Sequence, residues 1–329
     1  MAADSEATVL EKKDDSPKIP EKKKTKFDVI IIGAGPAGYT AGIYCSRAGY
    51  DTLILSGILP GGQLVNTTEV ENYPGFENGI MGPDLMIEMR KQTQRMGTTI
   101  IDDEAVNVDF RNSPFKILSG SEEYECRAII IATGANPRKL GLEGEKTFAG
   151  KGVSYCATCD GPFFRNQELI VVGGGDSAIE EATFLTKFAT KIHLVHRRDK
   201  LRASKVMQER AFNNDKIEFH WDSEVIDIKG DQKMQEGIIR NIQTKQETIL
   251  KVGGLFVAIG HEPNTELFKN QIDLDDEGYI ILKNKTLTNI EGVFAAGDVH
   301  DRTYRQAITA AGFGCMAAID VDKYLTEKS

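Results

Sequence analysis

The sequence predicts an α/β fold that contains two separate units of parallel strands and helices. Two stretches show the same succession of an apolar, β-branched run, a glycine-rich turn, a helical segment and a second apolar run. The first begins with the run at 27–32 and the second with the run at 168–172. Apolar runs with little alternation are typical of parallel strands that are buried on both faces. Second strands are expected at 51–55 and 191–196.

Composition narrows the functional classes. The 329 residues are 40% hydrophobic and 27% charged, which suits two globular domains of ordinary size. A net charge of −9 argues against a surface that binds nucleic acid or anionic membrane. The apolar runs are too short to span a bilayer. Because the start lacks a signal-peptide pattern and the five cysteines form no dense framework, we expect a cytoplasmic protein.

Residues 1–26 differ from the rest of the chain. They are rich in lysine and acidic residues, contain two prolines and lack aromatic side chains. Such a segment cannot bury enough apolar surface to offset the entropy of ordering, so a disordered tail is predicted. The lysine-rich stretch at 22–26 is compatible with a nuclear-import signal, but a solvated linker is the preferred interpretation.

The first glycine-rich turn has the pattern that binds a pyrophosphate. Gly33 permits the tight bend, Gly35 lets backbone amides approach the phosphates, and Gly38 allows close packing of helix on strand. The helix N-terminus then offers free N–H groups and a partial positive charge. The turn comprises Gly33, Ala34, Gly35, Pro36, Ala37 and Gly38.

The second turn predicts a different ligand, because the residues about 20 positions later differ. An acidic residue there would bind the ribose 2′-hydroxyl of NAD, but this position carries a basic cluster: His196, Arg197, Arg198 and, slightly later, Arg202. Arginine suits a phosphate, so we expect NADPH rather than NADH; a solvated basic turn is the alternative. The first unit has neither an acid nor a basic cluster at 55–57, which fits FAD. The second turn contains Gly173, Gly174, Gly175, Asp176 and Ser177.

The remaining strands suggest how the two Rossmann-like units are connected. Short strands that end in small-residue turns are expected at 127–132 and 254–259, on either side of the second unit, with a further strand at 292–296. We therefore predict an NADPH-binding domain at 139–262, inserted into an FAD-binding domain formed by 27–138 and 263–329. The two crossings near 135–138 and 260–264 are candidate hinges.

Cys156 and Cys159 are predicted to form a redox-active disulfide. Two cysteines separated by two residues at a helix start can close a small ring, and a helix N-terminus favours the thiolate. Zinc would need two more ligands at suitable spacing, and the histidines are scattered, so no metal site is expected; inert thiols are the other alternative. Asp160 is placed to exchange a proton with the thiols, or else only to satisfy the helix dipole. Cys45, Cys126 and Cys315 have no partner at motif spacing, and Cys45 and Cys315 are expected to be core residues.

With these motifs the chain resembles the low-molecular-weight thioredoxin reductases, within the class II pyridine nucleotide-disulfide oxidoreductases. The resemblance covers nearly all of 27–329. It rests on both glycine turns, the Cys156–Asp160 motif, the His196–Arg198 cluster and four further motifs, at 61–64, 71–75, 297–299 and 305–307.

The resemblance implies an enzyme in which NADPH reduces FAD, FAD reduces the Cys156–Cys159 disulfide, and the dithiol reduces oxidised thioredoxin. Cys156 would attack the substrate and Cys159 would face the flavin. It also implies a homodimer and an inserted domain that rotates. Beyond the first turn, the implied FAD-site residues are Gly62, Gln63, Asn72, Val106, Ala132, Thr133, Gly134, Cys159, Gly297, Asp298, Arg305, Gln306 and Ala307.

Two other functions are compatible with parts of the sequence. One is a related reductase with another acceptor, such as a peroxiredoxin-type partner or a ferredoxin. The other is a non-catalytic, flavin-binding redox sensor. A ferredoxin reductase would not need the two cysteines, and a sensor would be expected to lack a cysteine or the arginines. Their presence favours the thioredoxin reductase interpretation.

Overall fold

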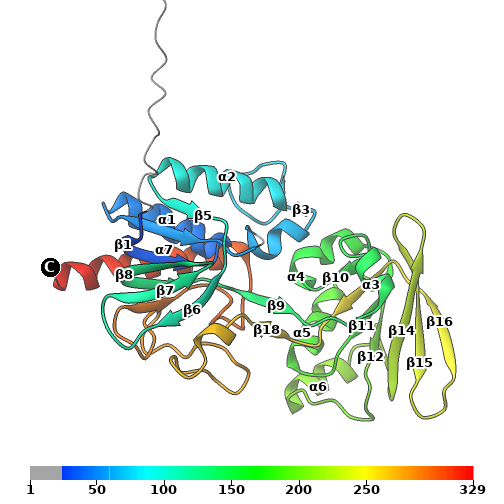
Figure 1. Cartoon of the computed structure of the whole chain (residues 1–329). Helices are drawn as coiled ribbons and strands as arrows, with labels where there is room; N and C mark the ends of the chain where they lie inside the picture. The colour runs from blue at the N-terminus through cyan, green and yellow to red at the C-terminus, as the bar shows by residue number, and fades with distance from the viewer. Residues whose placement is uncertain (1–23, 59, 329) are drawn as a thin grey trace, which may run out of the picture.

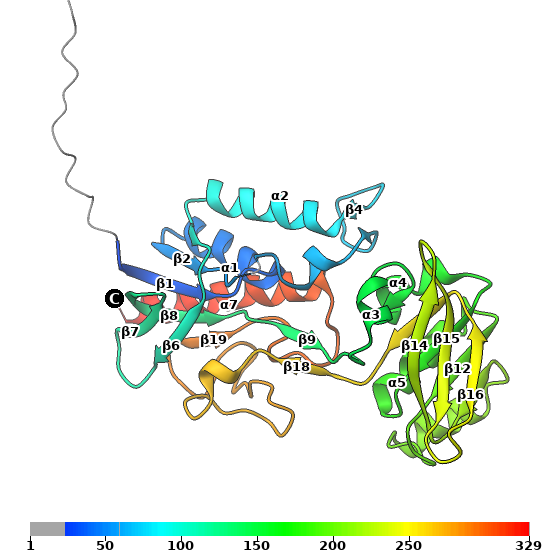
Figure 2. The same cartoon turned by 45° about the vertical axis from the view of Figure 1, so that its right-hand side comes forward.

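The computed structural model describes residues 24–58 and 60–328, which form two bodies of α/β structure side by side (Figures 1 and 2). Most of the predicted tail at 1–26 lies outside the described residues. Its last residue, Lys26, is the first residue of strand β1 (Lys26–Ile32), so regular structure begins one residue earlier than expected. Among the described residues, no helix has the length and apolar character needed to cross a membrane.

The first body is built on a sheet with the strand order β5-β2-β1-β8-β7-β6. Strand β8 pairs in parallel with β1 along its length, in antiparallel with β7 through its first half, and in parallel with β19 near its end. The predicted strands at 51–55, 127–132 and 292–296 are confirmed in this sheet, with small shifts at their ends. Its strands are β1, β2 (Thr52–Leu55), β5 (Thr99–Ile101), β6 (Ala105–Asp109), β7 (Phe115–Ser119), β8 (Glu122–Ile131) and β19 (Val293–Ala295).

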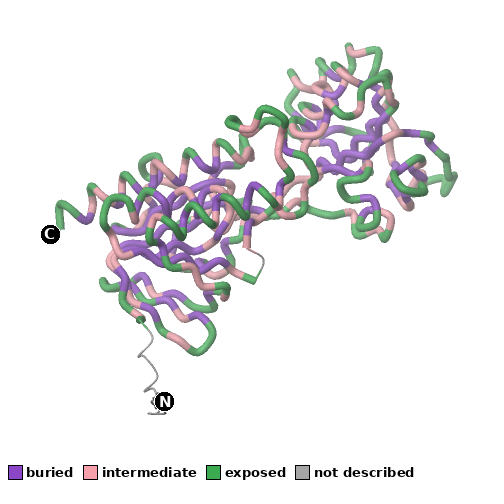
Figure 3. The backbone as a smooth tube through the Cα atoms, turned by 90° about the horizontal axis from the view of Figure 1, so that it is seen from above, coloured by how far each residue is buried: buried purple, intermediate pink, exposed green. Residues whose placement is uncertain are grey.

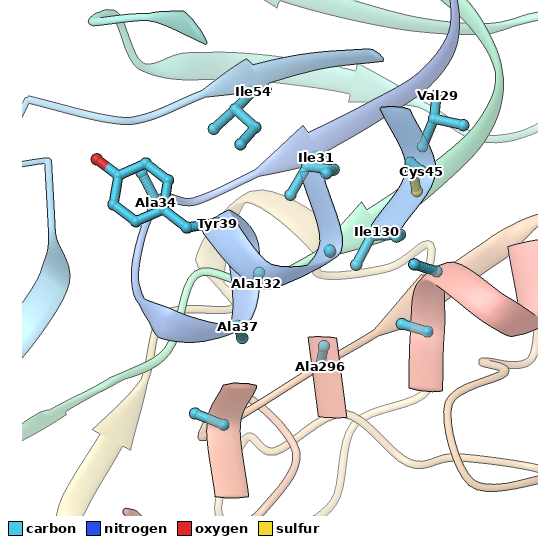
Figure 4. Packing of buried hydrophobic residues seen from close by; sticks show 14 of the residues in the cluster. Val29, Ile31, Ala34, Ala37, Tyr39, Cys45, Ile54, Ile130, Ala132 and Ala296 are labelled. Atoms are coloured by element: carbon cyan, nitrogen blue, oxygen red, sulfur yellow. The ribbon is translucent and has the colours of Figure 1, made fainter. Parts of the chain in front are cut away.

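Strand β1 is buried on both faces, as its continuous apolar sequence predicted. Val29 and Ile31 face a core shared with helices α1 (Pro36–Arg47), α2 (Gly82–Arg95) and α7 (Ala307–Glu327), shown in Figure 4. Ile30 and Ile32 face a second core, which β6, β7 and the segment 267–290 cover. Because both faces are occupied, the carboxyl edge of the sheet is the part of it that remains available to a ligand.

The second body repeats this plan around a parallel sheet with the order β10-β17-β11-β12-β13. Helices α5 (Asp176–Leu185) and α6 (Lys205–Phe212) cover one face. An antiparallel sheet covers the other face of the parallel sheet. Its strands, which were not expected from the sequence, are β14 (Ser223–Gly230), β15 (Met234–Asn241) and β16 (Glu247–Lys251). The parallel strands are β10 (Val153–Ser154), β11 (Glu168–Val172), β12 (Lys191–Val195), β13 (Ile217–His220) and β17 (Gly254–Val257).

A two-stranded antiparallel ribbon joins the two bodies (Figures 1 and 2). It consists of β9 (Ala135–Pro137) and β18 (His261–Pro263), and the Arg138 amide donates to the Gly260 carbonyl at 3.0 Å beside it. Buried residues gather in two groups, one on each side of this ribbon (Figure 3). The predicted boundaries at 138/139 and 262/263 fall at the ribbon, and the division into domains stays a prediction.

Short elements complete the chain. A β-hairpin-like pair and a 3₁₀ helix lie between β2 and α2, and four further short helices of the described residues lie in the second body or after it. These elements are β3 (Glu69–Val70), β4 (Ile80–Met81), η1 (Gly62–Asn66), α3 (Glu143–Thr147), α4 (Ala157–Asp160), η2 (Gly161–Phe164) and η3 (Glu266–Phe268).

Candidate active site

Cys156 and Cys159 form a disulfide at the start of α4, as the motif predicted. Cys156 caps this one-turn helix, and its Sγ accepts a hydrogen bond from the Cys159 amide at 3.2 Å. The same N–H group would stabilise a negative charge on Cys156 Sγ after reduction. The pair lies in the second body, on the side that faces the first.

Gln306, from the first body, contacts both sulfurs. Its Nε2 lies 3.7 Å from Cys156 Sγ and 3.8 Å from Cys159 Sγ, and its Oε1 accepts a hydrogen bond from Asn72 Nδ2 at 3.2 Å. Gln306 is also the N-cap of α7, in a capping box with Thr309. The disulfide therefore lies at the positive end of a 21-residue helix, where a thiolate is favoured. Two residues predicted for the FAD site, Asn72 and Gln306, meet here.

Asp160 lies close to the cysteines and is held by Ser154. Ser154 Oγ donates to Asp160 Oδ2 at 2.6 Å and accepts from the Cys156 amide at 3.1 Å. Burial raises the pKa of Asp160, and the hydrogen bond from Ser154 partly opposes this shift. A carboxyl with a raised pKa next to two thiols suits proton exchange with them. Sequence reasoning missed Ser154, because nothing in the motif marks it.

The first glycine turn has the geometry of a pyrophosphate cradle. Gly33 has φ +109°, and a Cβ atom there would lie 2.3 Å from the Ala132 carbonyl oxygen. A Cβ at Gly38 would lie 2.0 Å from the Gly33 carbonyl oxygen, whereas one at Gly35 would meet nothing within 4 Å. Gly35 is the N-cap of α1 and has no side-chain cap, so the first N–H groups of the helix face the open space beside it.

A cavity of about 740 Å³ opens at the carboxyl edge of the first sheet. It reaches from Gly33 and the end of β2 to Thr133, and the 262–269 segment closes its far side. Such a cavity can hold a nucleotide. Thr133 Oγ1 donates to the Asn264 carbonyl at 2.7 Å, and Gly134 follows with φ +69°. Ala132 to Gly134, which are among the residues predicted for the FAD site, thus lie beside the first turn.

The 61–66 segment and the residues after β19 complete the FAD-type site. The Gly61 amide donates to the Ala34 carbonyl at 3.0 Å, which brings Gly62 and Gln63 over the first turn. Gln63 Nε2 donates to Asn136 Oδ1 at 2.6 Å, and sequence reasoning had not identified Asn136. Val106 does not line the cavity: its side chain is 53% exposed on β6, and its neighbour Ala105 lines the cavity.

Asp298 carries a half-buried carboxyl group without a hydrogen-bond donor among the described residues. Gly297, at φ +79°, turns the chain against Ala37, which places Asp298 close to the first turn. Burial raises the pKa of Asp298 to about 7, and Asp301 adds to the shift. A ligand hydroxyl that donates here would satisfy the carboxyl group. With the open space at Gly35, this makes the residues present a good fit for a dinucleotide.

The second glycine turn lies close to the segment that carries the arginine cluster. A Cβ at Gly174 would lie 2.3 Å from the His196 ring, whereas one at Gly175 would meet nothing within 4 Å. The Arg202 amide donates to the Gly174 carbonyl at 2.7 Å, and the Ser204 amide donates to Asp176 Oδ1 at 2.8 Å. These two bonds tie the 202–204 segment to the turn.

The side chains of this cluster divide into a buried ring and exposed cations. His196 is buried, and its Nε2 lies 3.0 Å from the Lys200 carbonyl, so it supports the turn. Arg197, Arg198 and Arg202 are exposed and form no ion pair with the described residues. Unpaired guanidinium groups at this position suit the extra phosphate of NADPH.

A second cavity, of about 280 Å³, reaches Cys156 between the two bodies. Glu181, Ser177 and Arg305 are among its lining residues. Burial raises the pKa of Glu181 to about 7, and its Oε2 has no donor among the described residues.

Arg305, in a left-handed conformation at φ +46°, has a guanidinium nitrogen 2.9 Å from His261 Nδ1. Burial and the charge of this arginine lower the pKa of His261 to about 4. Ala307 begins α7 directly after Gln306.

Comparison with known proteins decides the family. Residues 27–314 match the family described as pyridine nucleotide-disulphide oxidoreductase. The thioredoxin reductase of Streptomyces clavuligerus is 54% identical over 301 residues, which cover 91% of this chain and 94% of that protein. The chain belongs to the thioredoxin reductase family. The resemblance noted in the sequence is thereby confirmed, as are the two-unit α/β fold and the family's cofactors, FAD and NADPH.

Solved thioredoxin reductases superpose on this chain to different extents. The one from Giardia duodenalis, 44% identical, superposes with a TM-score of 0.89 and covers 92% of this chain and 100% of its own. The one from Lactococcus lactis, described as in the FR conformation, is 45% identical over 92% of this chain and 99% of its own, yet its TM-score is 0.62. At nearly equal sequence identity and coverage, the two structures thus superpose on this chain to different extents.

The contrast between Gly38 and Gly35 gives a first prediction. Gly38→Ala places a methyl group against the Gly33 carbonyl and should lower the free energy of unfolding of the flavin-free chain by about 2 kcal/mol or more. Gly35→Ala has room for its methyl group and should change stability by less than about 1 kcal/mol, but it fills the cradle and should weaken FAD binding. Urea unfolding and flavin ultrafiltration measure the two effects. Equal stability of the two variants would contradict the described turn.

Proposed function

We propose that this chain is an NADPH-dependent thioredoxin-disulfide reductase. The observation that carries the proposal is the Cys156–Cys159 disulfide, positioned between two glycine-turn units and against the N-terminus of α7. The relatives that cover more than nine-tenths of the chain carry the name thioredoxin reductase, which supports thioredoxin as the protein substrate.

Each cofactor has its own binding residues. FAD would bind to the first turn, Gln63, Thr133 and the Asp298 carboxyl group. NADPH would bind to the second turn, with its 2′-phosphate at Arg197, Arg198 and Arg202. Together the cofactors supply the electron pair and the proton that open the Cys156–Cys159 bond.

The dithiol then reduces the substrate by exchange of sulfur bonds. The Cys156 thiolate attacks one sulfur of the substrate disulfide, forms a mixed disulfide and releases a substrate thiolate. The Cys159 thiolate next attacks Cys156 Sγ, which restores the internal disulfide and releases the second substrate thiolate. Asp160 exchanges protons with these sulfurs. Cys156 suits the attacking role because the 280 Å³ cavity reaches it and does not reach Cys159.

The arrangement of the bodies suggests that the second must reorient during turnover. Gln306 and α7 cover the disulfide, so a protein substrate cannot reach both sulfurs in this arrangement. The β9–β18 ribbon is the connection about which the inserted body would turn, and we propose that the domains are 27–138 with 263–329, and 139–262. The different TM-scores of two equally similar thioredoxin reductases support such a movement.

We also propose that the protein is a cytoplasmic homodimer. Helix α7 carries Ile308, Cys315 and Ile319 along one stripe, and the two isoleucines are exposed. Tyr44 of α1, 44% exposed, contacts Cys315. An apolar stripe of this kind is a candidate contact between two copies of the chain.

Replacing each cysteine separately tests the exchange step. Cys156→Ser should abolish thioredoxin reduction, while NADPH still bleaches the flavin absorbance, because the nucleotide sites are untouched. Cys159→Ser should also stop turnover but should trap a mixed disulfide between Cys156 and thioredoxin, visible on a non-reducing gel. Cys315→Ser is the matched control and should turn over normally. A trapped complex in Cys156→Ser instead would reverse the two roles.

Removing the arginines tests the nucleotide preference. Arg197→Ala combined with Arg202→Ala should raise the KM for NADPH by tenfold or more, because about 1.4 kcal/mol corresponds to tenfold and two charge-assisted contacts are lost. The KM for NADH should change little. Steady-state kinetics with both nucleotides measure the ratio, and Arg210→Ala, an exposed arginine on α6, is the control. An unchanged ratio would show that the arginines do not contact the 2′-phosphate.

The Ser154–Asp160 hydrogen bond predicts a pH shift. This bond favours the carboxylate, so Ser154→Ala should raise the pKa of Asp160 further. The inflection that Asp160 contributes to the pH profile of substrate reduction by the reduced protein should therefore move to higher pH, and it should vanish in Asp160→Asn. Rapid-mixing rates across the pH range provide the test, with Ser119→Ala as a control at a buried serine elsewhere. A shift to lower pH would be inconsistent with the assigned role.

A further inference from the structure

Two histidines that lie far apart in the sequence meet on the second parallel sheet, away from both glycine turns. His193 on β12 is the register partner of Glu218 on β13, and His220 follows two residues later on the same face of β13. His193 Nδ1 lies 3.0 Å from His220 Nε2 and 4.0 Å from Glu218 Oε2, and His220 Nε2 lies 3.6 Å from Glu218 Oε1. Sequence spacing gave no sign of this cluster, and no metal site was expected.

A carboxylate behind His193 fixes the orientation of its ring. His193 is 5% exposed, and its Nε2 lies 2.9 Å from Glu168 Oε2 on β11. The carboxylate can only accept, so Nε2 carries a proton and Nδ1 of the neutral ring is left with its lone pair directed at His220. Metal-binding histidines are commonly oriented in this way, with the second ring nitrogen donating to a carboxylate.

The candidate ligand atoms lie near one another, and Glu218 has to move to reach metal-binding distances. Zinc binds nitrogen and carboxylate oxygen at about 2.0–2.2 Å in tetrahedral geometry, which separates neighbouring ligand atoms by about 3.3 Å. The two imidazole nitrogens, 3.0 Å apart, are already close to this value, whereas one oxygen of Glu218 lies 3.6 Å from His220 and the other lies 4.0 Å from His193. One ligand atom from each residue lies within 4.8 Å of the other two. The carboxylate of Glu218, with its side chain 46% exposed, would turn inward by about an ångström to bind the ion.

The cluster also contains a competing cation. Lys191 on β12 forms an ion pair with Glu218, and it shares a face of the strand with His193. A bound metal ion would take over Glu218 and release Lys191, whose side chain is 41% exposed and can extend into solvent. The exchange is favourable because a divalent ion contacts the two imidazoles and the carboxylate at once.

We propose that His193, His220 and Glu218 bind one divalent transition-metal ion such as Zn²⁺, with water in the fourth position and Glu168 orienting His193. None of these residues belongs to the disulfide or to the proposed cofactor sites. The ion would join β12 to the edge strand β13, next to the bond from the His196 amide to the His220 carbonyl at 3.0 Å. It would thus stabilise the strand end that leads into the arginine cluster.

Calorimetric titration of Zn²⁺ into the chelator-treated, flavin-loaded, oxidised protein tests the proposal. The disulfide keeps Cys156 and Cys159 from binding the metal, so one Zn²⁺ per chain is expected. His220→Ala and Glu218→Gln should each weaken binding at least tenfold, and Glu168→Gln should weaken it about 10- to 100-fold through the ring of His193. Glu247→Gln, an exposed glutamate on β16, is the control and should bind as the unmodified protein does.

Two further measurements separate the possible outcomes. Circular dichroism and thermal unfolding in chelator should show His220→Ala to be folded, so that weaker binding reports on the site; Zn²⁺ should raise the melting temperature of the unmodified protein and not that of the variant. The proposal is overturned if the unmodified protein binds no Zn²⁺, or if His220→Ala binds it as tightly. Binding that persists in His220→Ala but disappears in a Cys156→Ser, Cys159→Ser double variant would likewise overturn it.

Discussion

The contact between Gln306 and the two cysteine sulfurs is the constraint on which the arrangement of the molecule depends. The disulfide belongs to the inserted body, whereas Gln306 caps the last helix of the other body. Where these groups touch, the thiolate-stabilising end of α7 and the dithiol lie together. The same contact covers the sulfurs from one side. In the proposed reaction a folded protein substrate requires this contact to open, and the two-stranded ribbon of β9 and β18 is the connection about which the bodies would turn.

The two nucleotide sites share a backbone design but differ in electrostatics. In each turn one glycine, Gly35 or Gly175, faces open space, whereas the other glycines are pressed against carbonyl oxygens or a ring. The first site adds a half-buried carboxyl group, Asp298, whose pKa is raised by burial. The second adds exposed guanidinium groups. A neutral ribityl chain suits the first environment and an extra phosphate suits the second, so selectivity comes from side chains outside the turns.

Much of the fold and of the candidate site was predictable because neighbouring residues in the sequence encode it. The apolar runs before each turn, the Cys156–Cys159 spacing and the arginines after β12 are all readable from neighbouring residues. Features that depend on contacts between residues far apart in the sequence could not be predicted. Asn136 meets Gln63 across 73 positions, and His193 meets His220 across 27. The β14–β16 sheet escaped prediction because its strands carry many charged residues and only one of its faces is buried. Val106, inferred from resemblance alone, is exposed on β6 and outside the cavity.

The order of elements along the chain has a consequence for synthesis. The first core needs Ala310, Ala317 and Val321 of α7. The whole inserted body is translated before them. It can close its own sheets while the earlier strands β1, β2 and β8 still lack the helix that covers them. Nascent chains that stop before residue 307 should therefore present an exposed apolar face and should depend on chaperones until α7 has been translated.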